Sequence, residues 1–166
     1  MLPRVLIVMG VSGTGKTTLA SALAEAYRAR YVEADDYHPQ ANIDKMAGGT
    51  PLTDEDRWPW LRALRDEIEA ALAAGQPLVV TCSALKQRYR DVLKREGERV
   101  RFVFLDGDFE TIYARMQQRD HFMPAAMLQS QFDALEPPTD ALRVPTTLTT
   151  EAQVALVDEH LTHTAA

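Results

Sequence analysis

The chain has 166 residues, of which 46% are hydrophobic and 25% charged, with a formal net charge of −6 and a pI near 5.2. This length suits a single domain with a substantial core, and the acidic balance, with no run of more than two basic residues, argues against a nucleic-acid partner. No stretch approaches the ~20 apolar residues of a membrane span, the N-terminus resembles no secretory leader, and the lone Cys82 cannot form an internal disulfide, so we expect a cytoplasmic protein.

The first predicted elements are a strand over Val5 to Met9, a glycine-rich loop, and a helix with apolar residues at helical spacing from Leu19 to Tyr27. The loop has the P-loop spacing G-x-x-x-x-G-K-T. Its glycines let backbone N–H groups approach phosphate oxygens, and the helix N-terminus that follows favours an anion. The residues predicted to bind nucleotide are Gly10, Val11, Ser12, Gly13, Thr14, Gly15, Lys16, Thr17 and Thr18.

Two side chains of this loop have separate predicted tasks. Lys16 is expected to reach the β- and γ-phosphates as a point charge, and the Thr17 hydroxyl is expected to ligate the Mg²⁺ that bridges them. The motif predicts nucleotide binding and leaves the reaction open.

A short second strand over Arg30 to Ala34 ends at two acidic residues, Asp35 and Asp36. In open α/β sheets ligands bind beyond the carboxyl ends of the strands. Either acid is therefore a candidate base at the predicted site.

Strands and helices then alternate. A helical turn over Asn42 to Met46 precedes a helix that Thr53 can cap and Gly75 can end. Strands are expected over Leu78 to Cys82 and Val100 to Leu105, each followed by a helix, of which the first should extend to Gly97 and the second should be capped by Asp108. This alternation predicts right-handed crossovers and a doubly wound parallel sheet.

The regular order loosens over residues 117–138. Arg115 and Arg119 lie four residues apart on one predicted helix face, and the stretch that follows contains His121 before Pro124 begins a short helix. We interpret residues 117–138 as a lid and the two arginines as its cations. A weak edge strand over 143–146 and a last helix from about 151 to 161 complete one domain over residues 1–166.

A P-loop protein can be a switch GTPase, a motor or ring ATPase, or a small-molecule kinase. The strings Asn-Lys-x-Asp and Asp-x-x-Gly expected of a GTPase do not occur, and motors generally need a longer chain. The remaining class transfers a γ-phosphoryl group to a hydroxyl, which requires a base, a substrate pocket and cations under a lid. Asp35 or Asp36, the segment 36–62 with the loop after the third strand, and Arg115 with Arg119 supply these parts.

Several strings also carry a resemblance to one family. They are the P-loop GVSGTGKT at 10–17, DDYHP at 35–39 with Asn42 and Lys45-Met46, GTPLTDEDR at 49–57 followed by PWL at 59–61, CSALK at 82–86 with Tyr89-Arg90, and HFM at 121–123 with Gln131 and LEP at 135–137. With these strings in order over residues 5 to 138, the sequence resembles the gluconate kinase family, small P-loop enzymes that use ATP to phosphorylate D-gluconate at its 6-hydroxyl.

The resemblance implies a three-layer α/β fold like that of nucleoside monophosphate kinases, with a five-stranded parallel sheet in the order 2-3-1-4-5, Mg-ATP as phosphoryl donor, a mobile lid and a homodimer. It implies Lys16, Asp35 and Arg119 as catalytic residues, with Asp35 as the base. It also implies Arg115 stacking on adenine and Glu33 helping in the magnesium shell. The implied gluconate-binding residues are Asp35, His38, Arg57, Ser83, Lys86 and His121.

Two alternatives remain open. One is a shikimate-kinase-like enzyme acting on another small hydroxy acid, which the CSALK loop disfavours because that family has a glycine-rich segment there. The other is a nucleotide-gated binding module without transferase activity, which a missing base or missing lid arginines would favour.

Overall fold

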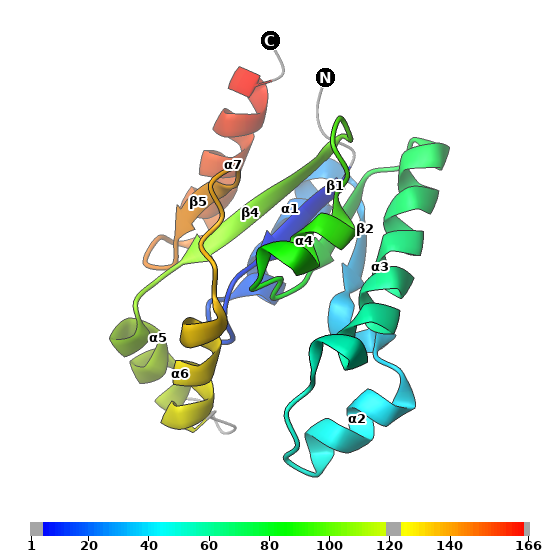
Figure 1. The fold of residues 1–166 in the computed structure, drawn as a ribbon. Helices are drawn as coiled ribbons and strands as arrows, with labels where there is room; N and C mark the ends of the chain where they lie inside the picture. Colours follow the sequence, from blue (N-terminus) through cyan, green and yellow to red (C-terminus); the bar gives the residue numbers. More distant parts are fainter. Residues whose placement is uncertain (1–4, 119–123, 165–166) are drawn as a thin grey trace.

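A computed structural model describes residues 5–118 and 124–164 and places five parallel strands in one sheet, in the order β2-β3-β1-β4-β5 (Figure 1). The predicted sheet and its strand order are confirmed. The strands are β1 (Val5–Met9), β2 (Arg30–Glu33), β3 (Leu78–Thr81), β4 (Val100–Asp106) and β5 (Leu142–Pro145).

The helices also follow the predicted order. They are α1 (Lys16–Tyr27), the 3-10 helix η1 (Ala34–Tyr37), α2 (Gln40–Ala47), α3 (Asp54–Ala74), α4 (Gln87–Leu93), α5 (Phe109–Gln117), α6 (Ala125–Ala134) and α7 (Thr150–Thr164). The N-cap expected at Asp108 is present, since its carboxylate accepts a hydrogen bond from the Thr111 amide at 2.7 Å.

One helix boundary was predicted wrongly. Helix α4 ends at Leu93, four residues before Gly97, and Lys94 is already extended. The Glu98 carboxylate accepts hydrogen bonds from the Arg95 amide at 2.7 Å and from the Arg65 guanidinium, and these contacts hold the chain in a turn at this point.

Helices cover both faces of the sheet. Along β1, Val5, Ile7 and Met9 belong to the core shared with α3 and α4, whereas Leu6 and Val8 belong to the core shared with α1 and α7. Figure 1 shows α4 in front of the sheet and α1 behind it. Burial on both faces explains why β1 and β3 appear in the sequence as continuous apolar runs without alternation.

Helix α3 has the ends that the sequence predicts. The Thr53 hydroxyl accepts a hydrogen bond from the Asp56 amide at 3.2 Å, and the Asp56 carboxylate accepts one from the Thr53 amide at 2.9 Å, which together form a capping box. Gly75 ends the helix in the left-handed conformation with φ of 67°. The indole of Trp60 is buried and donates to the Ala34 carbonyl at 2.7 Å, so α3 is fixed against the end of β2.

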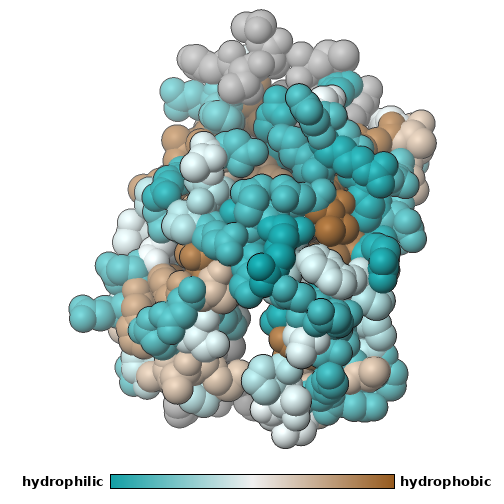
Figure 2. Space-filling model, viewed as in Figure 1, coloured by the Kyte–Doolittle hydropathy of each residue, from teal (hydrophilic) through white to brown (hydrophobic). Residues whose placement is uncertain are grey.

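Helices α5 and α6 form a smaller lobe beside the glycine loop. A third apolar cluster contains Val11 of the loop, Ile112 and Met116 of α5, and Leu128 of α6. Figure 2 shows a mostly hydrophilic surface that is hollowed between this lobe and the part that contains α2. The assignments of residues 36–62 to substrate binding and 117–138 to a lid stay predictions, as does the single domain over 1–166.

No helix within residues 5–118 and 124–164 is both long and apolar enough to cross a membrane.

The lobe leaves no space for a side chain at Gly13. This residue has φ of 83°, and a Cβ built on it would lie 2.6 Å from Sδ of Met116. Gly97 has a similar φ of 80°, with nothing within 4 Å of such a Cβ. Left-handed backbone costs a residue with a Cβ about 1–2 kcal/mol, so both Gly→Ala changes should destabilise the fold.

We therefore predict that Gly13→Ala lowers the free energy of unfolding more than Gly97→Ala does. Overpacking against Met116 should make the difference between the two losses about 1–3 kcal/mol. Denaturant unfolding of the two variants measures the difference directly. Equal losses would show that Met116 moves aside without cost.

Candidate active site

The glycine loop leaves backbone donors open at the start of α1. Gly15 is the N-cap residue, and within the described part of the chain no side chain caps this helix and no acid lies in its first turn. The amides there fit an anion without rearrangement. The Lys16 ammonium donates to the carbonyls of Gly10 at 3.0 Å and Val11 at 2.9 Å, so it lies across the loop.

Lys16 also lies near the acids that follow β2. Partial burial lowers the pKa of Lys16, and the negative charges of Asp35 and Glu33 oppose this effect. A lysine of this loop and the predicted base therefore lie within electrostatic reach of each other.

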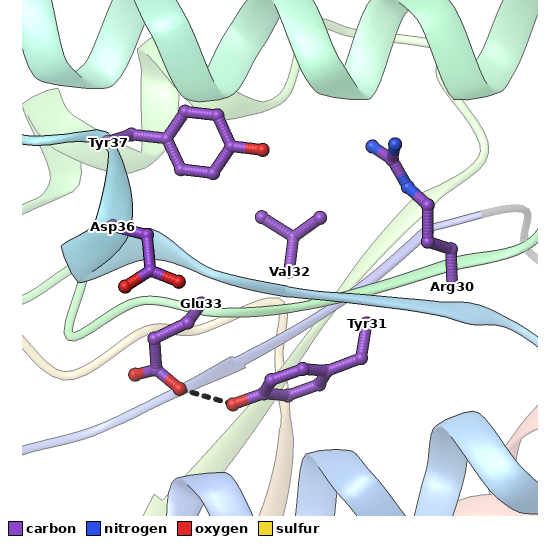
Figure 3. Close-up of a pocket in the computed structure, with 6 residues that line it drawn as sticks. All are labelled: Arg30, Tyr31, Val32, Glu33, Asp36 and Tyr37. Carbon is purple, nitrogen blue, oxygen red and sulfur yellow. Dashed lines mark hydrogen bonds between the residues drawn. The ribbon is translucent and has the colours of Figure 1, made fainter.

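The two adjacent acids of η1 have different surroundings. Oδ1 of Asp35 lies 3.9 Å from Nε2 of His38, and the Asp35 side chain is 80% exposed. Asp36 instead lines a cavity of about 410 Å³ at β2, the edge strand of the sheet, together with Arg30, Tyr31 and Tyr37 (Figure 3). Of the two carboxylates, it is that of Asp35 whose charge acts on Lys16.

His38 is held by neighbours that fix which ring nitrogen carries the proton. The amide nitrogen of Asn42 lies 2.8 Å from the Asp56 carbonyl, to which it donates, and 3.2 Å from Nδ1 of His38. Because an amide nitrogen only donates, Nδ1 must accept and Nε2 carries the hydrogen that faces Asp35. The ring stacks on Trp60 at a centroid distance of 4.2 Å, and burial lowers the pKa of His38.

A cluster of cations surrounds Tyr89. The Arg57 guanidinium lies 5.4 Å from the Tyr89 ring centroid and donates to its hydroxyl at 3.3 Å, and the Lys86 ammonium lies 5.9 Å from the same centroid. The Tyr89 hydroxyl donates to the Asp54 carboxylate at 2.6 Å. Arg57 also donates to the Leu52 carbonyl at 2.8 Å, which fixes its position. Two predicted gluconate ligands, Arg57 and Lys86, are thus brought together on one aromatic ring.

Oxygen ligands that suit magnesium lie beside the loop. The Thr17 hydroxyl donates to a Glu33 carboxylate oxygen at 3.4 Å, and the Tyr31 hydroxyl donates to the same oxygen (Figure 3). Among the residues that the structure describes, no group of three or more histidine, cysteine, aspartate or glutamate side chains could hold a metal ion. Magnesium commonly uses one or two protein oxygens together with substrate phosphates and water, so the donors present fit it.

Helix α6 contacts the glycine loop directly. The Ser12 amide donates to Oε1 of Gln131 at 2.7 Å, and Nε2 of Gln131 donates to the Ser12 hydroxyl at 3.0 Å. Arg115 of α5 donates to the Thr146 carbonyl at 2.8 Å, beyond the end of β5. Arg119 and His121, predicted as a lid cation and a substrate ligand, lie outside the described residues.

Sequence reasoning assigned no role to several residues that organise this site. Asn42, Tyr89 and Gln131 occur in or beside the strings of the resemblance, but each acts through a partner distant in sequence. Asn42 reaches Asp56, Tyr89 reaches Asp54, and Gln131 reaches Ser12. Their presence in the strings of the resemblance was the available signal, and it does not identify the partner.

The comparisons with known proteins agree with this geometry. A family model described as an AAA domain matches residues 5–138. The thermosensitive gluconokinase of Escherichia coli (strain K12) is 51% identical over 133 residues, which cover 80% of this chain and 71% of that protein. The crystal structure of a gluconokinase from Sinorhizobium meliloti 1021 superposes with a TM-score of 0.83 at 40% identity, over 99% of both chains. Shikimate kinase from Aquifex aeolicus vf5 has a TM-score of 0.64 at 15% identity over 97% of this chain and 98% of its own, and shows the fold alone.

The parallel sheet in the order 2-3-1-4-5, the glycine loop and its lysine define a small P-loop kinase. Within that class, the chain belongs to the gluconokinase family.

The surroundings of His38 predict its titration. Burial opposes the charged form of His38, and protonating Nδ1 would place a second hydrogen opposite the N–H that Asn42 already donates. The pKa of His38 should therefore lie below the ordinary 6.5. The unfolded chain then binds this proton more readily, so His38 contributes stability above pH 6.5 that is lost as the pH falls.

NMR titration of the histidine ring protons measures this pKa, with His38→Gln assigning the signal. In Asn42→Asp a carboxylate faces Nδ1 and should raise the pKa of His38. An unshifted His38 in Asn42→Asp would contradict the proposed tautomer.

Proposed function

We propose that this chain transfers the γ-phosphoryl group of ATP to the 6-hydroxyl of D-gluconate, giving 6-phospho-D-gluconate and ADP. The observation that carries the proposal is that β1 and β2 are parallel strands of one sheet, so the glycine loop with Lys16 and the η1 turn with Asp35 both follow strand ends at the same edge of that sheet. Membership of the gluconokinase family supports gluconate as the acceptor.

The loop would bind the triphosphate through the amides at the start of α1. Lys16 would exchange its contacts with the Gly10 and Val11 carbonyls for the β- and γ-phosphates, where a fixed positive charge stabilises the transferring group. Arg115 is held at the Thr146 carbonyl, beyond β5, and we propose that it stacks on the adenine ring from there.

Magnesium would be held by the Thr17 hydroxyl, with Glu33 accepting from its shell. When bound, the ion supplies charge that neutralises the phosphate oxygens. The Tyr31 hydroxyl orients Glu33 toward Thr17 and so keeps this carboxylate in place.

The substrate carboxylate would bind the cations around Tyr89. Arg57 and Lys86 bring two positive charges to one aromatic ring, and a guanidinium suits a carboxylate through paired N–H donors. The Nε2–H of His38 would donate to a gluconate hydroxyl, and the Ser83 hydroxyl could donate to or accept from another. A sugar acid held at one end by cations and at the other by Asp35 would span the hollow between α2 and the α5–α6 lobe (Figure 2).

The transfer itself needs one proton movement. Asp35 would orient the 6-hydroxyl and accept its proton while that oxygen bonds to the γ-phosphorus and the bond from this phosphorus to the β–γ bridging oxygen breaks. Charge spreads over the transferring oxygens, and Lys16 and Arg119 would stabilise it. ADP leaves with the bridging oxygen.

The resemblance also leads us to propose a homodimer that works in the cytoplasm. Sedimentation of the purified chain would give the oligomeric state.

Substrate profiling tests the reaction. ADP release measured with gluconate, shikimate, glycerate and nucleoside monophosphates should be stimulated by gluconate. Lys16→Ala should lower turnover by several orders of magnitude with the fold intact, because the transition state loses its nearest fixed charge. Stimulation by shikimate alone would end the gluconate assignment, and normal turnover in Lys16→Ala would end the loop's assigned role.

The two adjacent acids provide a matched pair of variants. Asp35→Asn should lower the turnover number far more than it raises the KM for gluconate, because the base acts chiefly in the transition state. Asp36→Asn makes the same chemical change at the exposed neighbour that faces the edge of β2, and should retain most of its activity. Steady-state kinetics of both variants decide the point, and the reverse pattern would make Asp36 the base.

A further inference from the structure

A buried arginine outside the proposed ligand set holds the loop that follows β3. Arg90 of α4 is only 2% exposed. Its Nη1 donates to the Ala84 carbonyl at 2.7 Å, and its Nη2 donates to the Glu136 carbonyl at 2.7 Å and to the Gln87 side chain at 3.2 Å. Within the described part of the chain these partners are carbonyl and amide oxygens.

A second buried arginine, by contrast, is paired with carboxylates. Arg65 of α3 is 6% exposed, but its charge is matched by the carboxylates of Glu98 and Glu69. A buried charge costs free energy unless it is paired or fully hydrogen-bonded. Arg90 makes no ion pair within 4 Å among the described residues, and its buried Nε has no partner there. Its Nη1 and Nη2 bonds to carbonyl and amide oxygens therefore carry the compensation at close range, while the carboxylates of Glu136, Asp140 and Asp91 act from further away.

The first of these carbonyls belongs to a strained loop. Ala84 has φ of 46°, in the left-handed region that a residue with a Cβ seldom adopts. It lies one residue after Ser83 and two before Lys86, both proposed gluconate ligands. The bond from Arg90 to the Ala84 carbonyl therefore stabilises the conformation that sets the direction of both side chains.

The second carbonyl belongs to the segment that leaves α6. The Glu136 amide donates to the Leu85 carbonyl at 2.7 Å, and the Glu136 carboxylate accepts from the Gln87 amide at 2.9 Å. Together with Arg90, these bonds join residues 84–87 to the end of α6. The same helix contacts Ser12 of the nucleotide loop through Gln131.

We propose that Arg90 is a positioning residue for gluconate binding, which fixes the Ala84 turn against Glu136 so that Ser83 and Lys86 are presented to the substrate. The inference rests on the proposed function for its substrate. Its structural part, the hold of Arg90 on residues 84–87 and 136, stands independently of the reaction.

The test replaces each buried arginine by methionine. Arg90→Met should raise the KM for gluconate by about tenfold or more while the KM for ATP changes by less than about twofold, because the loss falls on the substrate loop. Arg65→Met also removes a buried guanidinium, but one that donates to the Leu93 carbonyl at the far end of α4 and makes no bond to residues 84–87, and it should leave the ratio of the two KM values unchanged. Arg90→Lys keeps the positive charge but replaces the planar guanidinium with one ammonium group. Its KM for gluconate should fall between those of wild type and Arg90→Met.

Hydrogen exchange provides a readout that needs no substrate. The amides of Gln87 and Glu136 should lose protection in Arg90→Met and keep it in Arg65→Met. Unchanged protection in folded Arg90→Met, or equal rises in both KM values, would overturn the proposal. If Arg90→Met does not fold, Arg90→Lys decides by the same two measurements. A wild-type chain inactive on gluconate would refute the proposed function, and the exchange data would still decide whether Arg90 holds the loop.

Discussion

The site depends on how closely the glycine loop can approach its neighbours. The loop runs from the central strand β1 into α1, and its backbone lies against Met116 of α5 so tightly that a single Cβ at Gly13 would overlap the sulfur. A side chain there would require Met116 to move or the loop to shift away from α5. The phosphate site is therefore a consequence of packing in the small lobe as much as of the glycine pattern.

The acidic side of the site is organised by the N-terminal end of α3. The capping box holds Asp56, whose carboxylate also binds the Lys45 ammonium at 2.8 Å. These bonds, first that from Lys45, lower the pKa of Asp56 to about 2. The carbonyl of the same residue accepts from Asn42, which orients His38, and Trp60 one turn further on fixes the carbonyl of Ala34 beside Asp35. One helix start thus sets the positions of Asp35, which we propose as the base, of its neighbour His38 and of the α2 segment.

Much of this architecture could be predicted from the sequence, but less of the side-chain chemistry could. β1 and β3 were predictable because burial on both faces requires continuous apolar runs, and the start of α3 was predictable because a capping box is local. Asp35 and Asp36 could not be separated, since their surroundings depend on the fold: Asp35 lies beside His38, whereas Asp36 lines the cavity at the β2 edge. Contacts across long separations, such as Tyr89 with Asp54, leave no periodic signal at all.

Phosphoryl transfer needs its reacting groups fixed to within a fraction of an ångström, yet the groups of this site come from many separate elements, and Ser83 and Lys86 lie on a loop. The structure meets this requirement by bonding the loops to one another at main-chain level. The Gly10 amide donates to the Ser83 carbonyl at 3.2 Å, and the Glu136 amide donates to the Leu85 carbonyl at 2.7 Å. The loop after β3 is thereby fixed on one side to the nucleotide loop and on the other to the end of α6. A movement of the glycine loop would therefore be passed to the loop after β3 through the bond between Gly10 and Ser83. The ATP and gluconate proposed to bind here would thus be positioned by one connected set of loops.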